Sequence, residues 1–176
     1  LGHVFAIDHH FQWASVSHLR YHQGRVAWLL GDKAVAREHF EESLTGELPN
    51  RFRAPAIVLC LSPSMHDGEQ ALNHVPEKYP WLRIAALARA GRDEEAVAFA
   101  EGRDDVDAAA FFLAMSYQRL GRMEQAQRCF ESGSRQLLQK SSSDMNEWRP
   151  EFLAVQAEAE RLLASGGESH FEEGSR

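Results

Sequence analysis

The sequence predicts an all-α solenoid of about four helical hairpins followed by a C-terminal capping helix. Apolar residues recur at intervals of three and four within paired runs, the spacing that places side chains on one face of a helix. The runs within a pair are joined by short turns that contain glycine. A small residue also recurs in the second run of each pair, as Ala36, Ala71, Ala96 and Ala126.

The clearest hairpin lies between Asp107 and Lys140, where the runs AAAFFLAMSYQRL and MEQAQRCFESGSRQLLQK meet at Gly121. Each run carries one apolar stripe. Two such helices shield each other only partly, so the hairpin is expected to need neighbours on either side.

Three further hairpins are expected upstream. The first joins a run from Trp13 to Leu30 with KAVAREHFEESL, and the last is WLRIAALARAGRDEEAVAFAEGR. Between them, RAPAIVLCL and GEQALNHV form a less regular pair. A run as short as AIVLCL also fits a buried strand, but its helical neighbours favour a helix.

The two ends of the chain differ from this pattern. Residues 1–12 have no clear period and are expected to form an arm of uncertain structure. After Lys140, a run with Phe152, Val155 and Ala159 on one face predicts the capping helix, which starts at Asp144 with a kink or nearer Arg149. We therefore expect one repeat domain over residues 13–164 and a disordered tail over residues 165–176.

The hairpin at Asp107–Lys140 resembles a tetratricopeptide repeat. Ala110, Leu113, Ala114 and Tyr117 match the first-helix pattern of that family, and Ala126 with Phe130 matches its second helix. The C-terminal part also resembles the last repeat and cap of tetratricopeptide arrays in large bacterial signalling proteins. The resemblance implies a right-handed superhelical solenoid that works as a non-catalytic scaffold for protein–protein interaction.

The same resemblance implies a concave groove, lined by the first helix of each hairpin, that binds a peptide or a partner helix. The groove positions counted back from the glycine turns are His18, Tyr21, Arg25, Trp28, Lys78, Trp81, Arg89, Phe111, Met115, Gln118 and Arg119. Four of them are basic and none is acidic, so we expect an acidic partner. Alternatively, the aromatic residues among them pack between repeats. The ends of the solenoid could also mediate self-association.

Composition narrows the function classes. The net charge of −7 argues against a nucleic-acid binder that works through overall basicity. No apolar run approaches the length of a membrane span, and we expect a cytoplasmic protein with no membrane partner. The two cysteines show no spacing typical of a zinc ribbon, and the nucleophile and nucleotide motifs of common enzymes are absent, so we expect neither an enzyme nor a cofactor.

The alternative function is a metal-dependent enzyme or metal sensor that uses the N-terminal histidines. His18 and His22 lie four residues apart, on one face of the expected helix, where two imidazoles can chelate one ion. His9 or His10 could add a ligand.

Overall fold

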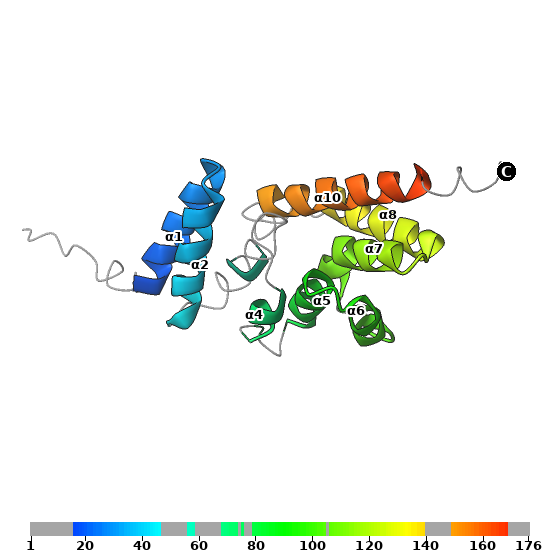
Figure 1. Ribbon diagram of the computed structural model, residues 1–176, viewed down its shortest axis with the longest axis horizontal. Coiled ribbons are helices and arrows are strands. Elements are labelled where there is room, and N and C mark those ends of the chain that lie inside the picture. Colours follow the sequence, from blue (N-terminus) through cyan, green and yellow to red (C-terminus); the bar gives the residue numbers. More distant parts are fainter. Residues whose placement is uncertain are drawn as a thin grey trace, which may run out of the picture. The chain divides into compact units, whose positions relative to one another are not determined.

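The computed structural model describes residues 16–46, 56–58, 68–73, 75, 79–104, 106–139 and 149–168, and among these residues it contains helices and turns but no strand. The predicted all-helical fold class is therefore confirmed (Figure 1). The chain divides into two compact units, residues 1–56 and residues 57–176, which are described separately here. A single domain over residues 13–164 and the right-handed superhelix stay predictions.

Unit 1 is a hairpin of α1 (Val16–Leu29) and α2 (Lys33–Thr45). Its core contains the fully buried side chains of Tyr21 and Phe40, whose ring centroids lie 6.2 Å apart. Gly24 faces Phe40 so closely that an added Cβ would lie 2.6 Å from the Cε1 atom of the ring. The absence of a side chain at Gly24 therefore lets the two helices approach each other.

The three glycine turns share one backbone geometry. Gly31, Gly91 and Gly121 have φ angles of 87°, 74° and 72°, in the left-handed region that glycine adopts without strain. In each turn, the residue after the glycine donates its backbone N–H to the carbonyl five residues earlier: Asp32 to Ala27, Arg92 to Leu87 and Arg122 to Tyr117. Five residues after each glycine lies a fully buried alanine. The repeat predicted from the sequence is therefore also a repeat of local structure.

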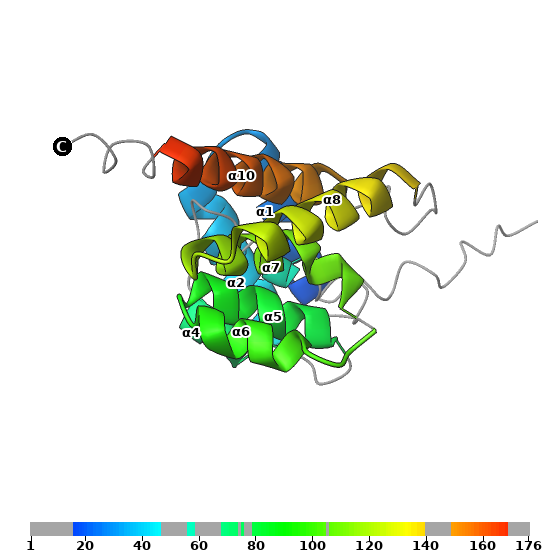
Figure 2. The same cartoon turned by 90° about the vertical axis from the view of Figure 1, so that its right-hand side faces the viewer.

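The other helices whose bounds the structure gives belong to unit 2. They are α4 (Gly68–Leu72), α5 (Pro80–Arg89), α6 (Asp93–Ala100), the 3-10 turn η2 (Asp107–Ala109), α7 (Ala110–Arg119), α8 (Met123–Gln139) and α10 (Arg149–Glu168). Figure 2 shows α5 and α6 in one layer, α7 and α8 in the next, and α10 across the outer side of α7 and α8. Phe112, Ile84, Leu82 and Met115, from α5 and α7, are buried.

The predicted pair RAPAIVLCL and GEQALNHV, the second along the chain, is described only in part. Residues 56–58 are helical and buried, which agrees with the helix prediction for the start of AIVLCL. The helix expected over residues 68–75 is shorter than predicted, because α4 ends at Leu72. Gly68 lies against the end of α5, where an added Cβ would be 2.2 Å from the backbone nitrogen of Ala90. This contact fixes α4 to α5.

The predicted capping helix is present as α10, which packs against α7 and α8. Its buried face holds Phe152, Val155 and Ala159, as the apolar stripe predicted. The described helix starts at Arg149, and Asp144 lies outside the described residues. α10 is described as far as Glu168, four residues beyond residue 164, and the tail boundary stays a prediction.

Candidate functional site

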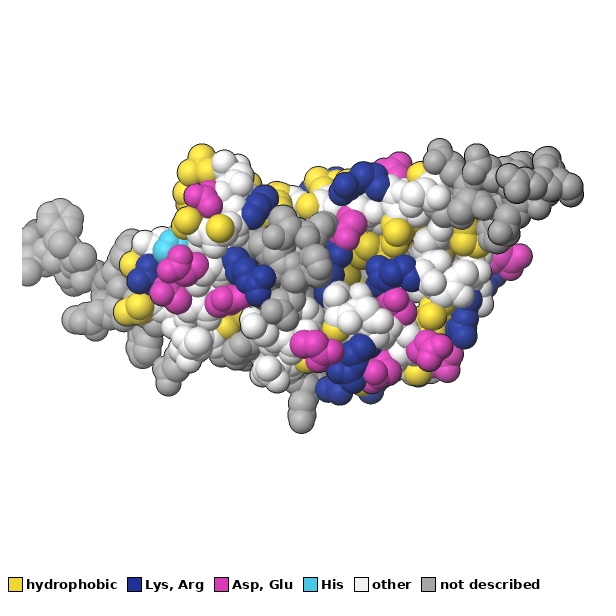
Figure 3. Space-filling model, in the orientation of Figure 1, with side chains coloured by type: hydrophobic (Ala, Val, Ile, Leu, Met, Phe, Trp, Pro, Cys, Tyr) yellow, Lys and Arg dark blue, Asp and Glu magenta, His cyan; other side chains and the backbone are white. Residues whose placement is uncertain are grey.

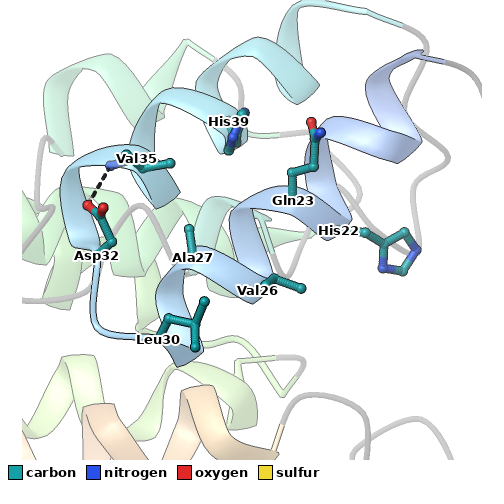
Figure 4. A pocket seen from close by; sticks show the side chains of 8 residues that line it. All are labelled: His22, Gln23, Val26, Ala27, Leu30, Asp32, Val35 and His39. Atoms are coloured by element: carbon teal, nitrogen blue, oxygen red, sulfur yellow. Dashed lines mark hydrogen bonds between the residues drawn. The ribbon is translucent and has the colours of Figure 1, made fainter.

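The α1–α2 hairpin carries an open apolar groove of about 470 Å³. It is lined from α1 and the adjoining turn by His22, Gln23, Val26, Ala27, Leu30 and Asp32, and from α2 by Val35 and His39. We call this the α1–α2 groove (Figure 4). All of its lining residues belong to unit 1.

The groove exposes large apolar side chains. Val26, Leu30 and Val35 are 57%, 80% and 38% exposed. Exposed apolar residues scattered singly are normal on a protein surface, but here three of them line one hollow. Figure 3 shows hydrophobic side chains gathered at the joined end of the two helices. An apolar hollow of this kind favours the binding of another apolar surface.

Contacts at the turn between α1 and α2 hold the groove residues in place. Asp32 caps α2, with its Oδ1 accepting the backbone N–H of Val35 at 3.2 Å. Lys33 donates to the carbonyl of Trp28 at 3.0 Å and lies 4.0 Å from the centre of the Trp28 ring. Partial burial lowers the pKa of this Lys33 ammonium. These contacts fix the start of α2 against the end of α1.

Polar side chains occupy the end of the groove that lies away from the turn between α1 and α2. His39 lies with its Nδ1 3.4 Å from the Arg20 guanidinium, and Arg20 forms an ion pair with Glu42 at 2.8 Å. Since positive and negative groups meet here, this end carries no strong charge of one sign. The groove is therefore better suited to an apolar ligand than to an ion.

The predicted groove residues of α1 share one side of the helix, which is not the side that lines the α1–α2 groove. Tyr21 is fully buried in the hairpin core and offers no surface to a ligand in this conformation. His18, Arg25 and Trp28 are half-buried, and none of them lines the α1–α2 groove. This side of α1 therefore packs partly into the hairpin at Tyr21 and is separate from the groove.

Four of the predicted groove residues of unit 2 lie in its core. Phe111, Met115, Gln118 and Trp81 are between 1% and 9% exposed. Phe111 packs edge-on against Phe130, with ring centroids 5.8 Å apart. Their prediction as an open peptide-binding surface is corrected in favour of the alternative, in which the aromatic residues pack between helices.

The basic groove predicted from Arg89 and Arg119 also needs correction, because both guanidinium groups form ion pairs with carboxylates of unit 2. Arg89 donates to both carboxylate oxygens of Glu158 in α10, and its side chain is only 6% exposed. Arg119 donates to Asp93 at 2.8 Å and to the carbonyl of Ala88 at 2.9 Å. Figure 3 likewise shows positive and negative side chains interleaved over α5 and α6. Lys78 lies outside the described residues.

The His18–His22 pair is brought together as predicted, with the two Nε2 atoms 2.9 Å apart. Over the described part of the chain, no group of three or more His, Cys, Asp or Glu side chains is placed to hold a metal ion. His9 and His10 lie outside that part. Within the same part, no helix is long and apolar enough to cross a membrane.

The sequence analysis missed the groove residues Val26, Leu30 and Val35. A signal was present in α1, which carries a second apolar stripe, Leu19, Val26 and Leu30, beside the buried stripe of Tyr21, Gly24 and Ala27. A helix of a two-helix hairpin needs only one buried face, so a second stripe predicts a further contact.

Residues 108–133 match a family model described as a tetratricopeptide repeat. The matched segment begins within η2, contains all of α7 and reaches Gly133 in α8. No curated protein and no solved structure matches the chain.

Proposed function

Because the chain contains a tetratricopeptide repeat at residues 108–133, we propose that it is a non-catalytic module for protein–protein interaction whose α1–α2 groove binds an amphipathic helix of a partner protein. Tetratricopeptide repeats generally mediate such interactions. The exposed apolar lining of the groove is the observation that carries the proposal.

The shape of the groove favours a helix. From His22 to Leu30 the α1 wall is about 12 Å long at the 1.5 Å rise of an α-helix. A hollow between two antiparallel helices accepts the side chains of a third helix in the same way as the core of a bundle does. The partner helix is then expected to carry apolar residues at positions i, i+4 and i+7, over about two turns.

The residues around the groove also predict which side chains flank the apolar stripe of the partner helix. Val26, Leu30 and Val35 supply the area, while His22, Gln23, Asp32 and His39 surround it with groups that form hydrogen bonds. Polar residues of either charge are therefore expected to flank the apolar stripe of the partner. This differs from the acidic partner expected from the sequence, which depended in part on Arg89 and Arg119, whose charges are paired within the fold.

Site-specific photocrosslinking of the full chain in its native cells tests this proposal. Benzoylphenylalanine placed at Leu30 should capture a discrete partner, whereas the same group at Leu138 should not. Leu138 is a matched control, because it is 76% exposed but belongs to α8 in unit 2. Val26→Asp should abolish the crosslink at Leu30 without unfolding the chain, since Val26 is largely exposed.

The captured segment then provides a direct measurement. A synthetic peptide of that segment should become helical when it binds the purified chain, and Leu30→Asp should weaken its binding at least tenfold. Equal crosslinking at Leu30 and Leu138, or a captured segment without an apolar stripe, would contradict the proposal.

A further inference from the structure

We infer that the partner helix of the α1–α2 groove is α1 of a second copy of this chain, an assignment that rests on the function proposed above. Two hairpins then pair about a two-fold axis, each placing its α1 in the groove of the other. The side chains that make the pairing possible form a line along α1, which we call the α1 seam: Val16, Leu19, Gln23, Val26 and Leu30.

The α1 seam has the spacing of a helix that packs lengthwise against another helix. Its residues follow one another at intervals of three, four, three and four, the repeat of a coiled-coil contact. On a straight helix they lie within roughly 80° of one another around the axis. Val16 and Leu19 are 75% and 56% exposed, so the exposed apolar side chains extend well beyond the groove.

The seam and the groove are parts of one surface. Gln23, Val26 and Leu30 belong to the seam and also line the groove, so the seam continues the groove towards the start of α1. A two-fold pair needs a surface that serves as ligand and receptor at once. Here α1 supplies an apolar stripe of the kind expected in the partner helix, with the polar Gln23 as its one departure, and α1 with α2 supplies the hollow.

The pairing resembles the packing in a four-helix bundle. Each α1 would lie against the other α1 and against Val35 and His39, which line the groove from α2. A single polar residue in an apolar seam restricts the register and the number of helices at a cost in stability. Gln23 is therefore expected to limit the strength of the pairing.

The exposed apolar side chains are concentrated in this hairpin. Among the described residues, six of the nine large apolar side chains that are exposed lie in the α1–α2 hairpin. The other three are Met123, Leu138 and Leu153, on α8 and α10 of unit 2. A contact between two copies that removes apolar surface from water is therefore favoured most at the hairpin.

The charge of the hairpin also favours a second copy. Residues 16–46 contain four cations and four carboxylates, which cancel when histidine is counted as neutral: Arg20, Arg25, Lys33 and Arg37 against Asp32, Glu38, Glu41 and Glu42. The chain as a whole has a net charge of −7, so all of this excess lies outside the hairpin. Two copies that meet through their hairpins therefore avoid the like-charge repulsion expected between their other surfaces.

The size of the surface predicts a reversible dimer. From Val16 to Leu30 the seam is about 22 Å long at the rise of an α-helix, and two adjacent helices are roughly 20 Å wide. One face of the hairpin therefore covers roughly 400 Å² in outline. Two such faces are at the small end of the range for protein interfaces, where complexes are weak. The dimer should therefore dissociate on dilution.

Sedimentation equilibrium of the purified full chain over a range of concentrations tests the pairing. The average mass should rise from that of one chain towards twice that value as the concentration increases. Val26→Asp places a carboxylate in the contact twice per dimer and should raise the dissociation constant roughly a hundredfold or more. Leu138→Asp is the matched control, because Leu138 is 76% exposed on α8, and it should leave the dissociation constant unchanged. Circular dichroism checks that each variant keeps its helices.

A second variant should strengthen the dimer, which misfolding cannot imitate. Gln23→Leu completes the apolar seam and should lower the dissociation constant about tenfold. Gln127→Leu makes the same change on the exposed side of α8 and should have little effect. A dimer that Val26→Asp leaves intact, or equal effects of Gln23→Leu and Gln127→Leu, would overturn the assignment.

Photocrosslinking separates this assignment from the proposed function. Benzoylphenylalanine at Leu30 of the purified chain should give a product of twice the mass of one chain, with its second end between residues 16 and 39 of the other copy. If the chain stays monomeric and the same group captures a different protein in cells, the second copy is ruled out and the proposed function stands. A crosslink confined to one chain would overturn both.

Discussion

Removing the guanidinium of Arg89 should destabilise unit 2 strongly, whereas removing both members of its ion pair should not. The Arg89 side chain is 6% exposed and that of Glu158 is 20% exposed, so Arg89→Met leaves a largely buried carboxylate without its partner. Loss of one partner from a buried pair costs about 3 to 5 kcal/mol. Because water still reaches Glu158, we expect a value near the lower end, about 3 kcal/mol.

Urea unfolding of the full chain measures this cost. With a typical slope of about 2 kcal/mol per M, a loss of 3 kcal/mol lowers the urea midpoint by about 1.5 M. Circular dichroism follows the helices. Tryptophan fluorescence adds a local probe, since Trp81 in α5 packs against Phe152 in α10 with ring centroids 6.1 Å apart.

Two further variants decide between explanations. Arg92→Met removes a guanidinium that pairs with Glu95 on the surface, and it should leave the midpoint nearly unchanged. The double change Arg89→Met with Glu158→Leu fills the same space with apolar atoms and should recover most of the lost stability. If Arg89→Met costs no more than Arg92→Met, or if the double variant is as unstable as the single one, the reasoning fails.

The remaining predictions concern packing and reactivity. Ala126→Leu should cost about 1 to 3 kcal/mol by overpacking in thermal unfolding, because Ala126 is fully buried, while Gln127→Leu on the exposed side of α8 should cost far less. Gly24→Ala should lower the melting temperature although alanine favours helices by about 1 kcal/mol, because its Cβ would meet the buried ring of Phe40. A higher melting temperature for Gly24→Ala would contradict that contact. Burial raises the pKa of the Cys129 thiol, so at neutral pH it should hold less thiolate than a free cysteine. In a chain whose other cysteine is serine, its alkylation should be slow and should keep accelerating as the pH rises past about 8.5, the ordinary thiol value; a plateau below that pH would be evidence against the raised pKa.

Local patterns were enough to predict the hairpins. Gly121 marks a backbone turn, and Ala126 marks a fully buried position in the helix that follows it. Both features lie within one hairpin, so nearby residues are enough to predict them. The same holds for the His18–His22 pair, whose spacing of four residues is itself a distance in space once the helix forms. Sequence reasoning was reliable wherever the interaction was local.

The groove prediction failed where the interaction was not local. Arg89 was counted as a groove residue from the spacing within its own hairpin, but its partner Glu158 lies 69 residues further along the chain. A helix period shows which residues share a face, and it does not show what covers that face. The exposed stripe of Val26 and Leu30 was overlooked for a related reason. The count of groove positions assumed that only one face of α1 contacts other parts of the protein or a partner.

The repeated turn geometry has a consequence for how the protein reaches its native state. Each turn closes through hydrogen bonds between residues only three to five apart, as Asp32 to Ala27 and Arg122 to Tyr117 show. Forming a hairpin therefore requires little loop-closure entropy, and chains rich in such short-range contacts fold quickly. On the ribosome, the α1–α2 hairpin has all of its own core residues as soon as Leu44 has emerged, well before α10 is made. Arg89, by contrast, is synthesised before Glu158, so its ion pair can form only after α10 has been synthesised.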